Sequence, residues 1–153
     1  MEKRDLRILH HLRKDSGRPL TEASKESGIP VTTIYDRMNE FRKELIKKQT
    51  VLLDFTKLGL LVKTHLLVKA ESDEREHIEE FLKEQACVNS LYRGNGSYDF
   101  MAECLFKNFL ELHKFIEGMC KNFRIIELSN YNIVEEIKKE DFLTKIEHVE
   151  AQR

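Results

Sequence analysis

The order of hydrophobic patterns after residue 60 most constrains what this chain can fold into. In chain order, the patterns predict a strand at 60–70, a helix at 72–85, strands at 88–93 and 98–106, a helix at 109–120 and a strand at 125–134. Strand, helix, strand, strand, helix, strand is the βαββαβ order of ferredoxin-like domains. This part of the chain therefore predicts an antiparallel four-stranded sheet with both helices on one face.

Two local signals support that order of helices and strands. Ser72, followed by the acidic Asp73, Glu74 and Glu76, predicts the N-cap and first turn of a helix. The Gly- and Asn-rich segment Gly94–Ser97 predicts the turn of a hairpin.

Because apolar residues are plentiful in the strands, we expect the second face of the sheet to need a cover. A second copy of the chain is the simplest one, so the pattern predicts a homodimer.

The first 45 residues predict three helices. Apolar residues recur at helical spacing, first at Leu6, Ile8, Leu9 and Leu12 and later at Ile34, Met38 and Phe41. Ser16–Pro19 ends the first helix, a short second helix runs from Thr21 to Gly28, and Ile29–Pro30 opens the third. Two helices joined by a short turn and preceded by a third form a helix-turn-helix unit.

The third helix carries polar groups on the side away from its apolar stripe. Thr32, Thr33, Tyr35, Asp36 and Arg37 are of types that reach phosphates and base edges. Their position favours DNA binding. A generic three-helix bundle with a solvated polar face would show the same pattern, and the residues alone leave both interpretations open.

The charge is divided unevenly along the chain. The 153 residues carry a formal net charge of only -1, which for the whole chain argues against a strongly basic nucleic-acid binder. Residues 1–48, however, hold 12 Lys and Arg against 8 Asp and Glu, while residues 49–153 hold 14 against 19. A net of +4 beside a net of -5 indicates that the first part meets a polyanion, unless the split is a chance fluctuation.

Several classes of protein are excluded by what the sequence lacks. No run of about 18 uncharged apolar residues is present, and the charged N-terminal segment has no apolar signal core, so we expect a cytoplasmic protein. The cysteines, Cys87, Cys104 and Cys120, show no close pairing, which favours free thiols over a disulfide framework or a zinc site. No compact histidine motif, phosphate-binding loop or nucleophile–base set occurs. We therefore expect no enzyme, no metal and no cofactor.

Four segments in the same order resemble the Lrp/AsnC (feast/famine) family of transcription regulators. They are the opening-helix segment 5–15, the recognition-helix segment 28–38, the hinge exit 53–60 and the hairpin 94–100. Together they span roughly residues 4–138. The resemblance implies an α+β chain with a winged or three-helix helix-turn-helix DNA-binding domain at 1–48. A connecting strand would follow at 49–59, then a ferredoxin-like effector-binding and dimerisation domain at 60–138 and a charged tail at 139–153.

The resemblance also implies partners: double-stranded DNA and a second copy of the chain, with tetramers or octamers as further assemblies. The expected DNA-contacting residues are Arg18, Lys25, Thr32, Thr33, Tyr35, Asp36, Arg37, Arg42 and Lys43, supported by Lys47 and Lys48. Asp36 is unusual near phosphates, and it meets either a cytosine amino group or, as the favoured alternative, an ion pair with Arg37 or Lys43. Pro30 stands where the family has a capping Ser, so Thr32 is the expected substitute cap.

A small effector such as an amino acid is the remaining expectation. Its predicted site comprises Gly94, Asn95, Gly96, Ser97, Tyr98, Asp99 and Ser129. The glycines would let backbone N–H groups approach a carboxylate, and Asp99 would accept an amino group. The same residues also suit a plain hairpin turn, with Asp99 only stabilising it. The alternative function is a ligand-sensing or assembly module of the same architecture that has lost specific DNA binding.

Overall fold

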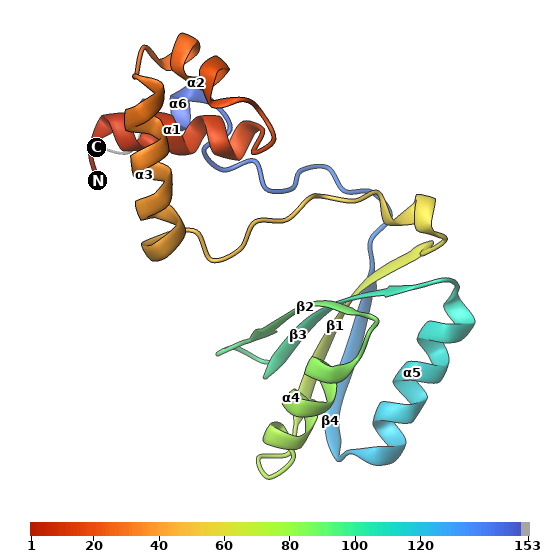
Figure 1. Cartoon of the computed structure of the whole chain (residues 1–153). Helices are drawn as coiled ribbons and strands as arrows, with labels where there is room; N and C mark the ends of the chain where they lie inside the picture. The colour runs from red at the N-terminus through yellow and green to blue at the C-terminus, as the bar shows by residue number, and fades with distance from the viewer. Residues whose placement is uncertain (151–153) are drawn as a thin grey trace. The chain divides into compact units, whose positions relative to one another are not determined.

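The computed structural model describes residues 1–150 and separates the chain into two compact units. The first unit is Met1–Val51 together with the chain from Ile137 onward, and the second is Leu52–Glu136. In Figure 1 the first unit contains only helices, whereas the second contains the sheet with α4 and α5. Within residues 1–150, no helix is long and apolar enough to cross a membrane.

The first unit is built on three helices, α1 (Lys3–Lys14), α2 (Leu20–Ser27) and α3 (Val31–Glu44). Their shared core consists of Ile8, Leu9, Ile29, Ile34, Met38 and Phe41, and the predicted apolar stripes provide most of it. Gly28 ends α2 with a φ of 71°, in the left-handed region that glycine adopts without strain. The predicted helix-turn-helix is confirmed in its three-helix form, because the described residues of this unit include no strand.

The start of α3 differs from the prediction that Thr32 caps it. Pro30 is the N-cap residue, and no side-chain capping hydrogen bond is formed there. The Pro30 carbonyl accepts the first intrahelical hydrogen bond, from Ile34 N–H at 3.0 Å. Thr32 already has helical backbone, so it cannot occupy the cap position. Proline suits this place because its ring fixes φ near the helical value.

The C-terminal segment belongs to the first unit. Phe142, Leu143, Ile146 and Val149 form an apolar stripe at helical spacing in this segment, but only α6 (Ile146–Glu150) is helical among its described residues, and residues 151–153 lie outside the described chain. Glu140 and Leu143 have φ values of 51° and 64°, which no right-handed helix can include. Val149 is 2% exposed, and α6 packs against α1. From the stripe, Phe142 and Ile146 remain exposed.

Polar contacts hold this segment, residues 137–150, on α1. His10 Nδ1 lies 2.9 Å from the carbonyl oxygen of Leu143. Arg13 donates to the carbonyl of Phe142 at 3.1 Å and to both the carbonyl and the carboxylate of Glu140 at 2.9 Å. These hydrogen bonds satisfy the carbonyl groups of Glu140, Phe142 and Leu143, which have no helical partner. They therefore stabilise the non-helical course of the segment.

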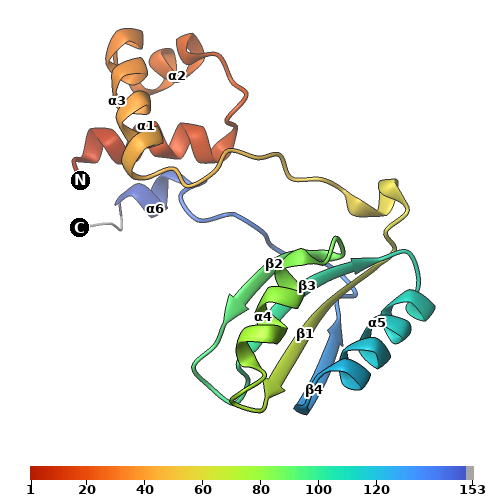
Figure 2. The same ribbon diagram turned by 60° about the horizontal axis from the view of Figure 1, so that its bottom comes forward.

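The second unit has the predicted βαββαβ order. Its elements are β1 (Val62–Ala70), α4 (Arg75–Glu84), β2 (Val88–Arg93), β3 (Phe100–Phe106), α5 (Phe109–Asn122) and β4 (Ile125–Asn132). The strands are antiparallel neighbours in the order β2-β3-β1-β4. Both helices cover the same face of the sheet (Figure 2), where Ile78 and Leu82 of α4 and Leu112 and Met119 of α5 are buried.

Two boundaries in this region differ from the predictions. The chain before residue 55 pairs with no strand of the described residues, so the expected connecting strand is absent and the segment continues into a short 3-10 helix, η1 (Phe55–Leu58). The side chain of Asp54 caps η1 by accepting from Thr56 N–H at 3.1 Å. Helix α4 begins at Arg75, and its N-cap is Glu74 rather than Ser72, because the chain first turns through residues 72–74.

The face of the sheet away from the helices is more polar than the strand composition predicts. Alternate residues of β1 from Val62 to Ala70 are buried against the helices, which uses most of the apolar side chains. The opposite side of β1 presents Lys63 and His65, whose side chains lie 3.1 Å and 3.5 Å from the carboxylate of Glu103 on β3. The apolar content of the strands therefore does not by itself require a second covering layer.

Candidate nucleic-acid interface

The outer face of α3 is the surface on which sequence reasoning placed DNA. Ile34, Met38 and Phe41 turn into the core at i, i+4, i+7, so the residues between them are left outward. Thr32, Tyr35 and Asp36 are exposed, and Tyr35 is 54% accessible. Thr33 is half-buried. The predicted polar residues at the start of the helix therefore share an accessible surface.

Arg37 is held inside the unit rather than extended from it. Its Nε and Nη2 lie 2.9 Å and 2.5 Å from the two carboxylate oxygens of Asp5 on α1, and Nη1 also pairs with Glu40. Asp5 is 2% exposed. Burial alone would raise the pKa of the Asp5 carboxyl, but the hydrogen bonds and charge of Arg37 outweigh it and lower that pKa. Arg37 thus fixes α3 against α1.

Arg18 has similar internal commitments. Its guanidinium lies 3.0 Å from Glu26, 3.8 Å from Asp15 and 4.0 Å from Glu22. Three carboxylates around one cation leave little positive potential for a phosphate. Arg18 and Arg37 therefore differ from the other predicted DNA-contacting cations, because carboxylates of the same unit compensate their charge.

The remaining cations are available to a polyanion. Lys25, Arg42 and Lys43 are exposed, and so are Lys47 and Lys48. Arg42 donates to the side-chain oxygen of Asn39 at 3.2 Å. Among residues 1–150, none of these five has an ion-pair partner, so no described residue compensates their charge by an ion pair.

Asp36 does not form the predicted ion pair. Arg37 turns to Asp5 and Glu40 instead, and Lys43 has no acidic partner in the described residues. The side chains of Asp36 and Arg37 point about 100° apart because they are consecutive residues of a helix. The Arg37 guanidinium therefore reaches Asp5 on α1 rather than Asp36. Asp36 is left as an exposed carboxylate on the face that would meet DNA.

The predicted effector hairpin is closed by its own polar groups. Asp99 Oδ2 accepts from Ala70 N–H at 2.9 Å, and Oδ1 lies 2.9 Å from Arg75 Nε. Gly94 N–H donates to the carbonyl of Asp99 at 2.8 Å. A Cβ at Gly94 would stand 2.8 Å from the carbonyl oxygen of Tyr98, so only glycine fits there. These contacts support the turn-stabilising interpretation of Asp99.

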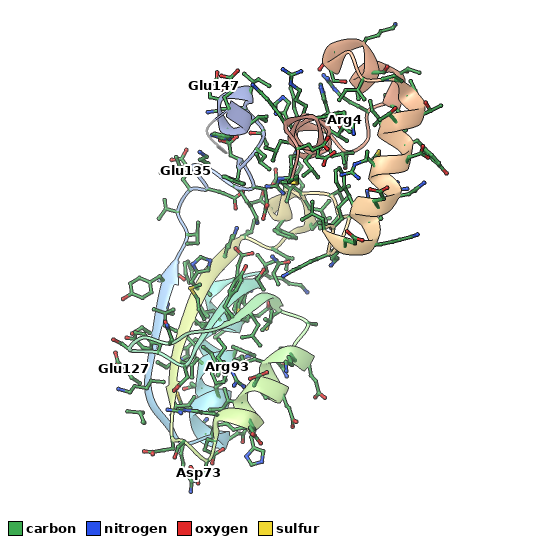
Figure 3. The ribbon with its side chains drawn as sticks, turned by 90° about the vertical axis from the view of Figure 1, so that its left-hand side faces the viewer. Arg4, Asp73, Arg93, Glu127, Glu135 and Glu147 are labelled. Carbon is green, nitrogen blue, oxygen red and sulfur yellow. The ribbon has the colours of Figure 1, made fainter. Side chains whose placement is uncertain are left out.

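Tyr98, in the turn between β2 and β3, and Ser129 of β4 are brought together by the fold. The Tyr98 hydroxyl lies 3.1 Å from Ser129 Oγ and donates to the carboxylate of Glu127, which is labelled on β4 in Figure 3. The hydrogen bond to the Glu127 carboxylate raises the pKa of the Tyr98 hydroxyl, because the bond is lost when the hydroxyl gives up its proton. Asn95, Gly96 and Ser97 are exposed at the tip of the turn.

Comparison with known proteins assigns the chain to a family. A model for winged helix-turn-helix DNA-binding domains matches residues 1–44. An uncharacterized HTH-type transcriptional regulator of Pyrococcus horikoshii is 30% identical over 139 residues, which cover 90% of this chain and 93% of that protein. An AsnC family transcriptional regulator from Agrobacterium tumefaciens superposes with a TM-score of 0.80 at 22% identity, covering 91% and 94% of the two chains. The chain belongs to the Lrp/AsnC family of transcription regulators.

Other Lrp/AsnC relatives agree. The HTH-type transcriptional regulator FL11 of Pyrococcus furiosus is 28% identical over 137 residues, covering 89% of this chain and 90% of FL11. A transcriptional regulator of Neisseria meningitidis, solved as a complex with L-Met, superposes with a TM-score of 0.83 at 17% identity over 91% and 93% of the chains. These homologues are regulators and not enzymes, and the matched helix-turn-helix is a DNA-binding one.

Two residues of this Lrp/AsnC chain were missed by sequence reasoning. Asp5 on α1 holds Arg37, and Glu127 on β4 binds Tyr98. Strand alternation could have indicated Glu127, since it shares a face with Ser129 two residues later. The role of Asp5 depends on a contact 32 residues away, which no local pattern contains.

Proposed function

We propose that this Lrp/AsnC regulator binds a specific DNA sequence through the outer face of α3, as a homodimer whose affinity a small effector modulates. One observation carries the proposal: Thr32, Tyr35 and Asp36 are exposed on α3, and uncompensated cations flank them. Hydroxyl, phenol and carboxylate groups can bond base edges in the major groove, while the cations contact phosphates without sequence preference.

The cations set the expected salt dependence. Lys25, Arg42, Lys43, Lys47 and Lys48 lack ion-pair partners among the described residues, so each can displace a counterion from the DNA backbone. If about six phosphates are neutralised per dimer, log K falls with log salt at a slope of roughly -5. This term supplies affinity, and the polar face of α3 supplies discrimination.

Fluorescence anisotropy with a selected DNA site and a scrambled duplex tests this division. We expect Lys43→Ala to weaken both duplexes alike and to flatten the salt slope by about 1 for each chain's lost contact. Thr32→Ala should weaken the selected duplex more than the scrambled one. Lys121→Ala, an exposed lysine on α5, is the matched control and should leave both unchanged. Equal loss of both duplexes in Thr32→Ala would contradict base reading by α3.

The effector proposal rests on Tyr98, Glu127 and Ser129. A carboxylate beside two hydroxyls can accept an ammonium group, and the Gly94–Ser97 turn offers exposed backbone close to them. The Neisseria relative bound to L-Met makes amino acids the first ligands to test. Calorimetry with the twenty amino acids should find one that binds the native protein and loses affinity in Ser129→Ala. Binding that Ser129→Ala leaves intact would place the effector elsewhere.

A homodimer is the proposed assembly, with larger oligomers built from it. Leu67 and Met101, which are cross-strand partners on the outer sheet face, would supply apolar contact area for the dimer, beside the polar side chains of Lys63, His65 and Glu103. Sedimentation velocity over a range of protein concentrations measures this assembly directly. A monomer at micromolar concentration would contradict it.

The engaged arginines favour one alternative. Arg18 and Arg37 are compensated by carboxylates, and Asp36 adds an exposed negative charge, as in a sensing or assembly module that has lost specific DNA binding. In that case amino-acid binding would persist, and the selected and scrambled duplexes would bind equally weakly.

A further inference from the structure

Two of the three cysteines lie side by side at the open end of the β2–β3 hairpin. Cys87 directly precedes β2, and its carbonyl accepts from Leu105 N–H on β3 at 2.8 Å. The next residue, Val88, is the cross-strand partner of Cys104. Backbone pairing at Cys87 and at Val88 therefore holds the start of β2 beside Cys104 and Leu105 of β3.

The side chains meet as well. Cys104 is completely buried in the core formed with Leu66 and Ala102, and Cys87 packs against the same core. Cys120 is exposed on α5, and all three thiols are free. Val88 is directly opposite Cys104, so Cys87 is one residue out of register with Cys104, and its packing on the shared core is what brings the two side chains together.

The two thiols differ in the way that a reactive pair requires. The hydrogen bond from Cys104 lowers the pKa of the Cys87 thiol. The same interaction, together with burial, raises the pKa of the Cys104 thiol. Cys87 is half-buried and Cys104 is not accessible, so Cys87 is the group that an oxidant can reach.

We propose that Cys87 and Cys104 form a reversible dithiol–disulfide pair that peroxides oxidise, which joins the start of β2 to β3 within one chain. This property is independent of DNA and effector binding. The bond would close the hairpin at the end opposite to its Gly94–Ser97 turn. It would also lie beside the irregularity between Val88 and Ser90, where the register of β2 on β3 shifts. A shift in pairing supplies local freedom to bring the sulfur atoms together.

The chemistry balances with one peroxide molecule. The Cys87 thiolate attacks a peroxide oxygen, the O–O bond breaks, and hydroxide leaves to take up a proton as water while Cys87 becomes a sulfenic acid. The Cys104 sulfur then attacks the Cys87 sulfur, the S–O bond breaks, and the oxygen leaves as a second water with the Cys104 proton. Two thiols are oxidised by two electrons, and the peroxide is reduced to water.

Peptide mapping of the native full-length protein tests the proposal. Cleavage after Lys and Arg places the cysteines in separate peptides, 84–93 with Cys87, 94–107 with Cys104 and 115–121 with Cys120. After hydrogen peroxide treatment and alkylation, we expect 84–93 linked to 94–107, with a mass lower by two hydrogen atoms, and 115–121 alkylated. Thiol titration should fall from three groups per chain to one and return to three with dithiothreitol.

Two variants separate this pair from ordinary surface oxidation. Cys87→Ser should abolish the linkage, while Cys120→Ser should leave it unchanged. The mapping of the unsubstituted protein decides the question even if Cys87→Ser folds poorly. The proposal is overturned if 94–107 stays alkylated after oxidation, if the linkage instead joins 115–121, or if Cys87 is converted to a sulfinic acid without a linkage.

Discussion

Arg37 of α3 and Asp5 of α1 form a two-point ion pair at 2.9 Å and 2.5 Å, with the carboxylate buried in the helix-turn-helix unit. The guanidinium also lies 5.4 Å from the ring centre of Phe41, so its plane is held by packing as well as by charge. This pair joins the proposed DNA-reading helix to the first helix. Arg37 therefore positions the face that Thr32 and Tyr35 present.

Removing the arginine should destabilise the first unit. In Arg37→Ala the Asp5 carboxylate is left buried without its cation, which should lower the free energy of unfolding of this unit. We expect this unit to unfold at a lower temperature in a thermal melt that is measured by circular dichroism. DNA affinity should fall only in proportion to the unfolded fraction. A variant that is equally stable but binds DNA weakly would show that Arg37 contacts DNA instead.

Acid should weaken the same ion pair in a defined range. The pKa of Asp5 is lowered in the folded protein from its ordinary value of 3.8, so the folded state favours the ionised form. This contribution is fully present above 3.8 and is lost as the pH falls through the lower folded value. Chemical denaturation of the native protein and of Asp5→Asn should give a stability difference that shrinks below that pH. A difference that stays constant down to pH 2 would contradict the argument.

The two glycines of the hairpin turn should respond differently to a methyl group. Gly94→Ala places a Cβ 2.8 Å from the Tyr98 carbonyl, so the backbone must shift, at a cost of about 1–3 kcal/mol. A Cβ at Gly96 meets nothing within 4 Å, and Gly96→Ala should be nearly neutral. Denaturant melts of both variants test this. Equal effects would mean that the close approach at Gly94 is relieved without cost.

The C-terminal segment offers a matched pair of substitutions within fourteen residues of chain. Val149 is 2% exposed against α1, and Val149→Ala should cost about 1–3 kcal/mol through lost burial and the cavity left behind. Ile137 is 92% exposed, and Ile137→Ala should have no measurable effect. Hydrogen exchange of the α1 amides should accelerate only in the first variant. Unchanged exchange would show that α6 does not support α1.

Local patterns were sufficient for the elements of both units. The stripe of Ile34, Met38 and Phe41 predicts a helix that turns one side inward, and the alternation in β1 predicts a half-covered strand. These features depend on the periods of helix and strand, which neighbouring residues express directly. Local spacing did not reveal the course of the C-terminal segment, where only Ile146–Glu150 is helical among the described residues. There, the carbonyl groups of Glu140, Phe142 and Leu143 bond to Arg13 and His10, partners that no nearby pattern contains.

The sequence by itself determined the architecture: a three-helix unit followed by a βαββαβ unit, and a polar face on the third helix. Only the tertiary structure decided which charges remain available on that face. Arg18 and Arg37 are engaged by carboxylates, and Lys25, Arg42 and Lys43 are not. It also decided that the Asp99 carboxylate binds Ala70 N–H and Arg75, and that Cys87 packs against the core that holds Cys104. Secondary structure follows from short-range periodicity, whereas the partner of a charge or a thiol depends on chain segments that only folding brings together.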